Sequence, residues 1–465
     1  MFDELTGIFA GIAAVCSDYV LVPVLLLTAI YFTVLLRGVQ FTMAGEMVRL
    51  LIRSGRRSHG ISSFQAFAVS IASRVGTGNL AGVASAIAIG GPGAVFWMWC
   101  IALLGAASAF VESTLAQLFK IRGRQSYVGG PAYYILKGLG QRWWAVTFAV
   151  LITVTFGLAF NSVQSNTIAE AMANSFGVGR GITAIVVAVL SLFIICGGIR
   201  RISRISEIIV PVMAVGYLIL AVTVIILNIH RVPEVVTLIF ENAFGFNEVM
   251  GGTFGSALIM GVKRGLFSNE AGEGSTPNAA ATATVSHPVK QGLIQALGVY
   301  TDTLIICSCT AFIILCSGLY IEGHNGIQLT QHAIDAGLHD GAGSLGSTFV
   351  CIAIFFFAFT SIIANYYYGE ANLRFIRDND RLINIYRLIV GVMVYAGGVA
   401  SLDLVWGFAD ITMSLMTICN IAAILAMGRY AVILLRDYTD QRRRGLDPQY
   451  RGSTIPGIAD RTECW

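Results

Sequence analysis

Apolar stretches long enough to cross a lipid bilayer recur from one end of this 465-residue chain to the other. Hydrophobic residues make up 56% of the sequence and charged residues only 12%, which is about half the charged share of a typical soluble domain. Because a backbone in hydrocarbon must satisfy its hydrogen bonds internally, such stretches form helices. The sequence therefore predicts an all-α polytopic membrane protein.

Eleven membrane-spanning helices are predicted. They cover residues 19–36, 64–90, 92–118, 145–174, 181–198, 207–228, 250–285, 291–317, 347–368, 383–400 and 406–433. With the N-terminus placed outside, 24 of the 30 lysines and arginines fall in the inner loops and ends, and only Arg180 and Arg231 fall outside. Basic residues concentrate on the cytoplasmic side. We therefore expect a multi-pass protein of the cell membrane (plasma or bacterial inner membrane), with its C-terminus in the cytoplasm and residues 440–465 as a flexible tail.

Two of these spans carry the same unusual motif, 190 residues apart. Residues 74–82 read RVGTGNLAG and residues 264–272 read RGLFSNEAG, so that an arginine, an asparagine, an alanine and a glycine coincide without a gap. Each motif interrupts an apolar span with glycine and polar residues. A pair of broken helices at matching places in two halves of a chain indicates the binding site of a transporter.

A second correspondence supports an internal repeat. AFNSVQSN at 159–166 matches AFTSIIAN at 358–365 at four positions, although chance similarity between apolar helices is the alternative explanation. Both pairs of matching spans lie five spans apart, and an odd offset implies opposite orientations. We predict a transmembrane domain over 1–439, with inverted five-helix units at 64–228 and 250–433 and an extra helix at 19–36.

Broken helices have a use inside a membrane because they free backbone groups that otherwise bond within the helix. The N-terminus of a half-helix offers N–H groups and a positive dipole end to an anion. Freed carbonyls suit a small cation such as Na⁺. One site near the bilayer midplane can then hold a carboxylate and a cation together, which is a way to couple their movement.

The longer motifs resemble those of the alanine/glycine:cation symporter family. They are RVGTGNLAGVASAIAIGGPGAVFWMW (74–99), GLFSNEAGEGSTPNAAATA (265–283), FNSVQSN (160–166) and FAFTSIIANYYYGEANLRF (357–375), and the resemblance covers about residues 19–440. It implies a fold like the sodium-coupled leucine transporters with one additional span. It also implies uptake of alanine, glycine or, in some members, glutamine, driven by Na⁺ or H⁺. Apart from that coupling ion we expect no cofactor, and we infer no obligatory protein partner.

Eight residues are candidates for the substrate site. Glycine lets a backbone leave helical geometry and approach a ligand closely, whereas small residues at a kink can also serve helix packing alone. At the second break, an aromatic side chain could close over a methyl-sized group, or the segment could be a structural turn. The candidates are Gly76, Thr77, Gly78 and Asn79 at the first break, Phe267, Ser268 and Asn269 at the second, and Gln164 in the fourth span.

The resemblance also assigns a cation site. Thr360 and Ser361, mid-span in the predicted ninth helix, would complete a Na⁺ site together with backbone carbonyls near Gly76. The alternative is that both hydroxyls bond to carbonyls of their own helix, as buried serine and threonine often do.

Several charged residues fall within the predicted spans. Glu273 replaces the methionine that is usual in the family, and it could pair with Arg264 or Lys263, alter the cation requirement, or reach water. Asp302 and Glu112 could line a proton or cation path. Each could equally pair with Arg74 or Arg264.

Other functional classes find less support. A channel would need a continuous pore, and an intramembrane enzyme could draw on Glu112, Glu270, Asp302 and His287. However, the sequence contains no H-E-x-x-H, no G-x-S-x-G and no P-loop. Its nine cysteines lack metal-binding spacing, and no basic face with stacking aromatics predicts nucleic-acid binding. The sequence therefore predicts a secondary active transporter that works by alternating access and is not an enzyme.

Overall fold

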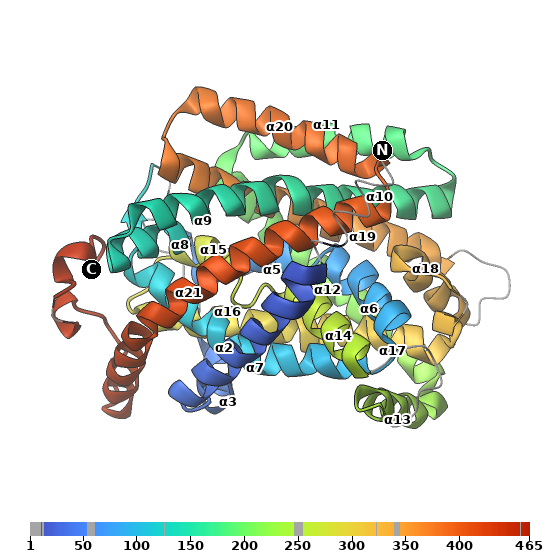
Figure 1. Cartoon of the computed structure of the whole chain (residues 1–465), viewed down its shortest axis with the longest axis horizontal. Helices are drawn as coiled ribbons and strands as arrows, with labels where there is room; N and C mark the ends of the chain where they lie inside the picture. The colour runs from blue at the N-terminus through green and yellow to red at the C-terminus, as the bar shows by residue number, and fades with distance from the viewer. Residues whose placement is uncertain are drawn as a thin grey trace.

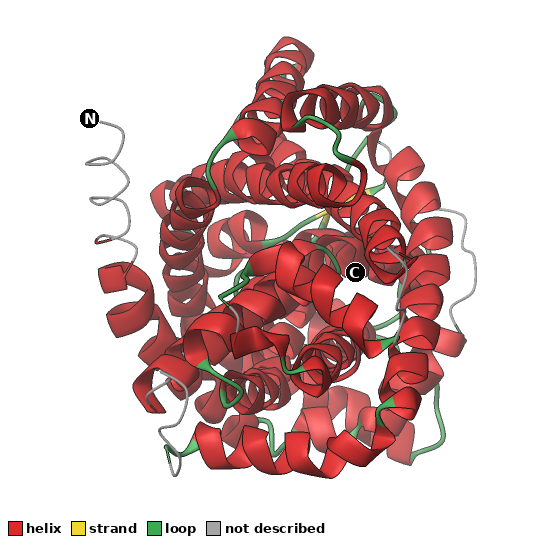
Figure 2. Cartoon of the chain, turned by 90° about the vertical axis from the view of Figure 1, so that its right-hand side faces the viewer, coloured by secondary structure: helices red, strands yellow, loops and turns green. Residues whose placement is uncertain are grey.

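The computed structural model describes residues 11, 14–53, 61–124, 126–245, 254–321, 323–338, 345–455 and 457–465. Within these ranges the chain is a bundle of helices joined by short loops (Figures 1 and 2). A small antiparallel ribbon joins β1 (Ile121–Arg122) to β2 (Tyr127–Val128), with Ile121 opposite Val128. The predicted all-α class therefore agrees with the structure.

The helices follow one another along the whole chain, with α-helices labelled α and π- or 3₁₀-helical segments labelled η. In order they are η1 (Val15–Leu21), α2 (Val22–Leu35), α3 (Val39–Thr42), α4 (Ala44–Ile52), α5 (Ser63–Arg74), η2 (Gly78–Gly82), α6 (Val83–Gly90), α7 (Ala94–Leu118), α8 (Pro131–Tyr134), η3 (Ile135–Leu139), α9 (Arg142–Val154), η4 (Thr155–Phe160), α10 (Asn161–Phe176), α11 (Arg180–Ile195), α12 (Gly198–Leu227), η5 (Ile229–Arg231), α13 (Val232–Ala243), α14 (Phe254–Asn269), α15 (Thr276–Thr282), α16 (Pro288–Val299), η6 (Tyr300–Cys307), α17 (Ser308–Ser317), η7 (Leu319–Ile321), α18 (Gly326–Gly337), α19 (Leu345–Ile376), α20 (Asp380–Val399), α21 (Leu402–Arg443), η8 (Gly452–Thr454) and η9 (Ala459–Arg461).

Over the described residues, each predicted span overlaps helix in the structure. Among the described residues, eight helices are long and apolar enough to cross a membrane, and the apolar helices at Gly78–Gly90 and Arg180–Ile195 are shorter. The predicted start of the seventh span at 250, and Arg56 and Arg57 of the charge count, lie outside the described residues. Helices α4, α13 and α18 occupy loops where no helix was predicted. The number of eleven crossings and the inverted repeat stay predictions.

The two interrupted helices lie in the middle of the bundle. In Figure 1 the labels of α5, α14 and α15 sit between the long helices α7, α19 and α21. Helix α7 packs against α14, α15 and α16, and α19 packs against α5 and α10. The outer face of α12 exposes Ile208, Val212, Val215 and Ile219. An apolar surface around a polar centre is what a lipid-embedded bundle requires.

The C-terminal segment is not the flexible tail that was predicted. Helix α21 continues to Arg443, beyond the predicted end of its span at 433, and the residues after it fold back on the bundle. The Tyr450 amide donates to the Ser286 carbonyl at 2.8 Å, and Trp465 Nε1 donates to the Gln117 carbonyl at 3.0 Å. Lys120 Nζ lies 4.7 Å from the centre of the Trp465 ring. These aromatic side chains attach a segment whose polar composition had suggested a free end.

Candidate functional site

The first interruption separates α5 from η2. Helix α5 ends at Arg74 because Val75 leaves helical geometry (φ −81°, ψ 95°), and helical structure resumes before Gly78. Asn79 Oδ1 accepts a hydrogen bond from the Gly76 amide at 2.9 Å. This side chain supplies the acceptor that the missing helical turn would have supplied. Residues 75–79 are all buried, so the break lies inside the protein.

The second interruption begins later than the sequence had suggested. Phe267, Ser268 and Asn269 form the last turn of α14 and are not themselves in the break, which covers 270–275. Positive φ angles at Glu270 (55°), Gly272 (89°) and Gly274 (85°) turn the chain out of the helix. Glycine adopts such angles without strain. The alternating glycines of 270–275, followed by Pro277 in the first turn of α15, were the signal that could have located it.

The two paired motifs contact one another beside the interruptions. A Cβ atom on Gly78 would lie 3.0 Å from Ser268 Cα and 3.2 Å from Phe267 Cδ1. Asp302 of η6 joins them through its carboxylate, because Asn79 Nδ2 donates to one oxygen at 2.6 Å and Ser268 Oγ donates to the other at 2.8 Å. Hence the paired motifs, far apart in the sequence, share one buried carboxylate.

Two further helices close on the first break. Gln164 Oε1 of α10 accepts from the Thr77 amide at 3.0 Å and from its hydroxyl at 2.8 Å. On the other side, Ser361 Oγ of α19 donates to the Ala72 carbonyl at 2.8 Å and lies 3.4 Å from the Val75 carbonyl. The space between them is filled, since a Cβ on Gly76 would lie 2.4 Å from Ser361 Oγ.

Not every candidate polar side chain faces the breaks. The Thr360 hydroxyl bonds to the Phe357 carbonyl of its own helix at 2.9 Å, which is the alternative that the sequence left open. Asn166 Nδ2 bonds to the carbonyls of Gly397 and Ala400 and so joins α10 to the end of α20. Ser361 Oγ also lies 3.0 Å from the Phe357 carbonyl, so both hydroxyls contact their own helix, and Ser361 differs in also reaching the Ala72 carbonyl of α5.

An aromatic wall stands beside the two breaks. The Phe267 ring centre lies 4.5 Å from that of Phe160 and 4.6 Å from that of Trp406. All three side chains are buried. Trp406 of α21 was not among the sequence candidates. It lies in the last span, which carries none of the motifs that pointed to the site, so the sequence contained no signal for it. Phe160 belonged to a quoted motif but was not assigned a role.

Arg264 and Lys263 do not pair with the acidic residues named from the sequence. Arg264 makes a bidentate ion pair with Asp410 of α21 at 3.2 and 3.1 Å, and its guanidinium carbon lies 4.0 Å from the Trp406 ring centre. Lys263 Nζ binds Asp410 at 3.2 Å and Asp18 at 3.1 Å. The suggested pairs of Arg264 with Glu273, Glu112 or Asp302 were therefore wrong, because Asp410 occupies its guanidinium.

A second set of carboxylates holds the broken segment 270–275. Glu112 of α7 accepts from the amides of Gly272 and Gly274 at 3.3 and 3.0 Å and from Asn420 Nδ2 at 2.9 Å. Glu270 accepts from hydroxyls on both sides of the gap, those of Ser73 and Ser275, each at 2.5 Å. These bonds replace the backbone pairs that a continuous helix would make.

Arg74, the last residue of α5, contacts a residue that flanks the same segment. Its guanidinium donates to Thr276 Oγ1 at 3.0 Å and to the Gln295 carbonyl at 3.2 Å, and its side chain is almost wholly buried. It thus links the end of α5 to the start of α15 across the interruption. The first arginine of the motif at 74–82 has a structural partner that the sequence alone did not show.

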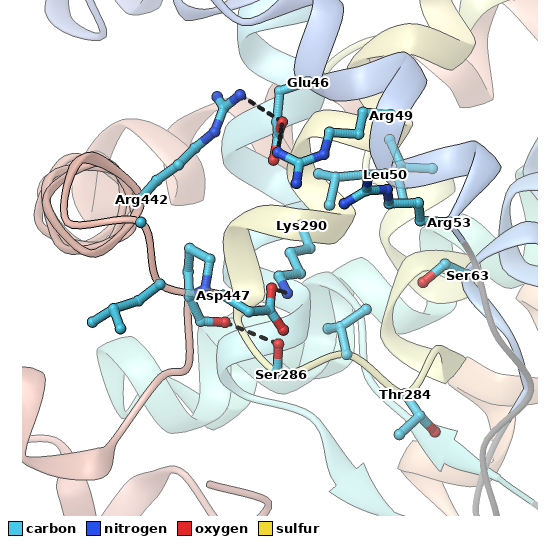
Figure 3. A pocket seen from close by; sticks show the side chains of 15 residues that line it. Glu46, Arg49, Leu50, Arg53, Ser63, Thr284, Ser286, Lys290, Arg442 and Asp447 are labelled. Carbon is cyan, nitrogen blue, oxygen red and sulfur yellow. Dashed lines mark hydrogen bonds and ion pairs between the residues drawn. The ribbon is translucent and has the colours of Figure 1, made fainter.

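A separate cavity of about 400 Å³ lies at one end of the bundle (Figure 3). Figure 3 shows Arg442 pointing to Glu46 and Lys290 to Asp447 across it, and Arg442 Nη2 lies 2.8 Å from Glu46 Oε2. The two broken spans meet at this end as well, since the Thr284 amide donates to the Ile61 carbonyl at 3.1 Å. Ser63, which lines the cavity, lies a whole helix α5 away from the first break. The cavity is therefore distinct from the candidate site.

Discontinuous helices that meet in the middle of an apolar bundle define a secondary transporter. The chain superposes on the crystal structure of MhsT in complex with L-phenylalanine with a TM-score of 0.55 at 14% sequence identity, covering 87% of this chain and 93% of that one, and so shares its fold.

The family follows from the sequence. The sodium:alanine symporter family matches residues 2–452, and the chain belongs to it. It is 49% identical to the amino-acid carrier protein AlsT of Bacillus subtilis over 99% of this chain and 98% of that protein. It is 51% identical to the probable sodium/glutamine symporter GlnT of the same organism over 96% of this chain and 93% of that protein. The protein is therefore a secondary active symporter and not an enzyme.

Proposed function

We propose that this protein uses a cation gradient, of Na⁺ or H⁺, to take up a small neutral amino acid such as alanine or glycine across the cell membrane. The contact between the two paired motifs carries this proposal, because it brings the freed backbone groups of the first break, Gln164 and Asp302 to one buried place. Family membership and the similarity to the amino-acid carrier AlsT and the probable sodium/glutamine symporter GlnT support an amino acid as the substrate. The N-terminus outside and the C-terminus in the cytoplasm complete the proposed topology.

The substrate carboxylate would meet the backbone N–H groups at Gly76–Gly78. The Gly76 and Thr77 amides bond to the side-chain oxygens of Asn79 and Gln164, and these oxygens stand in for carboxylate oxygens of a substrate. The ammonium group would meet carbonyl and side-chain oxygens near Phe267–Asn269 and Gln164. Phe267, with Trp406 behind it, would close over a methyl-sized side chain.

The coupling cation would bind beside Ser361. The hydroxyl of Ser361 lies at hydrogen-bonding distance from the Ala72 and Val75 carbonyls, and oxygen atoms grouped in this way suit Na⁺. Thr360 would join as a second ligand after releasing the Phe357 carbonyl of its own helix. Because these carbonyls end α5, cation binding and substrate binding would act on the same break.

Closure of both entrances is part of the proposed cycle. On one side of the breaks Arg264 and Asp410 join α14 to α21, and at the other end the Ile61–Thr284 contact joins the two broken spans. We propose that the first contact opens outward and the second opens to the cytoplasm, in turn. Two closures around a buried site favour alternating access over the continuous pore of a channel.

Uptake of labelled alanine into proteoliposomes tests the function. We expect accumulation when a Na⁺ gradient or a H⁺ gradient is imposed, and only equilibration when neither is present. A competition panel of unlabelled glycine, serine and glutamine then identifies the preferred substrate. Uptake that ignores both gradients would contradict symport.

A glutamine symporter is the second candidate, favoured by the 51% identity to GlnT. Glutamine needs a longer pocket than alanine along the Phe267 side chain. The same competition panel separates the two, because glutamine should then displace labelled alanine at lower concentration than glycine does.

Replacing Ser361 by alanine should weaken the cation site. The variant loses the hydroxyl that faces the Ala72 carbonyl. Loss of one ligand that contributes about 1–1.5 kcal/mol to cation binding should raise the Na⁺ concentration for half-maximal uptake by roughly tenfold. Thr223→Ala is the control, since that hydroxyl bonds to its own helix on an exposed face of α12. An unchanged Na⁺ dependence in Ser361→Ala would exclude this residue as a ligand.

A further inference from the structure

Glu273 is the carboxyl group that the proposed cycle has not used. It lies in the second break, between Gly272 and Gly274, and its side chain is completely buried. Neither of its carboxylate oxygens has a hydrogen-bond partner in the part of the chain that the structure describes. An ionised carboxylate in that setting costs several kcal/mol, so the site calls for a bound positive charge.

The neighbouring acids differ from Glu273 in their donors. Glu112 accepts two amides and the Asn420 side chain. Glu270 accepts three hydroxyls, including that of Thr276 at 3.3 Å. Asp302 accepts from Asn79, Ser268 and Thr303. Each of these three acids is therefore solvated by protein groups in the way that an ionised carboxylate requires.

The charges around Glu273 do not supply the missing partner. The charged and titratable groups that face it are Glu270 on its own segment, Glu112 on α7 and Arg74 on α5. Tyr134 on α8 and Tyr368 on α19 stand behind these acids. Arg74 directs its donors at Thr276 and the Gln295 carbonyl. Two nearby acids repel a further negative charge, and a single guanidinium offsets one of them.

We propose that Glu273 is a proton-binding site of this transporter, neutral while segment 270–275 is packed as in this structure. A proton satisfies a carboxyl group without further ligands. A metal ion needs several oxygens, and among the described residues no group of three or more histidine, cysteine or acidic side chains is placed to hold one. The proton is therefore the positive charge that fits.

The consequence for transport rests on the proposed function. When segment 270–275 rearranges to open the site, Glu273 meets water and releases its proton there; repacking of the segment requires a proton to return. Uptake should then fall as the pH rises, by at most about tenfold for each pH unit, in the range where return of this proton limits the cycle. Protonation thus becomes a step of the cycle, in addition to cation binding at Ser361.

Infrared spectroscopy of the purified protein tests the site without any transport. A protonated carboxyl group absorbs at a different infrared frequency from a carboxylate. At pH 7 the spectrum of Glu273→Gln should therefore lack a protonated-carboxyl band that the wild-type spectrum contains. Glu234→Gln, which removes an exposed acid on α13, should lose a carboxylate band. Loss of a carboxylate band in Glu273→Gln overturns the proposal. If that variant does not fold, Glu273→Asp decides: a shift of the protonated-carboxyl band relative to the wild type supports the site, and an unchanged band overturns the proposal.

Uptake as a function of pH tests the role in transport. At saturating substrate and Na⁺, wild type and Glu234→Gln should lose activity at alkaline pH, and Glu273→Gln should remain flat over the same range. An alkaline fall that persists unchanged in Glu273→Gln overturns the transport role. A protein that takes up no amino acid at all contradicts the proposed function instead, and leaves the infrared result to decide the proton site.

Discussion

Uptake is expected to fall by about 10- to 100-fold when Gly76 is replaced by alanine. The added methyl group would lie 2.4 Å from Ser361 Oγ and 2.7 Å from Gln164 Oε1, so the break, α19 or α10 must move. Overpacking a tight interior costs about 1–3 kcal/mol, and here the displaced groups are the proposed cation and substrate contacts. Initial uptake rates of the labelled amino acid, normalised to protein in the membrane, measure the effect.

Gly82→Ala is the matched control for Gly76→Ala. Gly82 lies in the same broken span, but a methyl group there would meet its nearest neighbours at 3.7 and 3.8 Å, which is ordinary contact. We expect it to transport at close to the wild-type rate. Equal activity of the two variants would show that close approach at Gly76 is irrelevant to transport.

Replacing Asp302 by asparagine should have an effect of similar size, about 100-fold on uptake. The carboxylate accepts hydrogen bonds from Asn79 of the first motif and Ser268 of the second, and hydrogen bonds to a charged group contribute about 1.5–3 kcal/mol each. The asparagine side chain has one acceptor oxygen in place of two. Its NH₂ group would therefore face one of the two donors, Asn79 Nδ2 or Ser268 Oγ. The two breaks then lose their shared partner, and substrate affinity and maximal rate should both decline.

Asp403→Asn controls for the loss of an acidic side chain, because Asp403 is exposed in the first turn of α21. The thermal unfolding midpoint should be recorded for both variants, so that a folding defect is separated from a defect of the site. If Asp302→Asn folds normally and transports at the wild-type rate, Asp302 does not couple the two breaks.

The approximate positions of the two helix interruptions were predictable because their determinants are local. Helix interruption follows from glycine and polar residues within an apolar span, and both motifs carry them. The limits of the second break were predicted too early, since Phe267–Asn269 continue α14 and the positive φ angles begin at Glu270. The helix propensity of the residues does not show which turn of a motif unwinds, because contacts with other helices decide it. Here Glu112 accepts a hydrogen bond from a backbone amide of 270–275, and Glu270 accepts one from a hydroxyl of the same segment.

The residues of distant spans that contact the candidate site could not be predicted from the sequence. Arg264 pairs with Asp410, 146 residues away, and Trp406 completes the aromatic wall beside Phe267. Asp410 and Trp406 both belong to α21, whose sequence carries no motif that matches another span. Likewise Thr360 and Ser361 are adjacent in sequence, yet Ser361 reaches the Ala72 carbonyl whereas the Thr360 hydroxyl bonds within its own helix.

The amino-acid sequence by itself determined that this is a helical membrane protein, where its long apolar helices lie and which two of them are interrupted. The length needed to cross hydrocarbon and the need to pair every backbone N–H and C=O there act on short segments. Only the tertiary structure decided which charges pair, which side chains enclose the breaks, and that the C-terminal segment packs on the bundle. Those outcomes depend on the distances between helices that are far apart in sequence, and a buried carboxyl such as Glu273 is distinguished from its neighbours only by the donors that reach it.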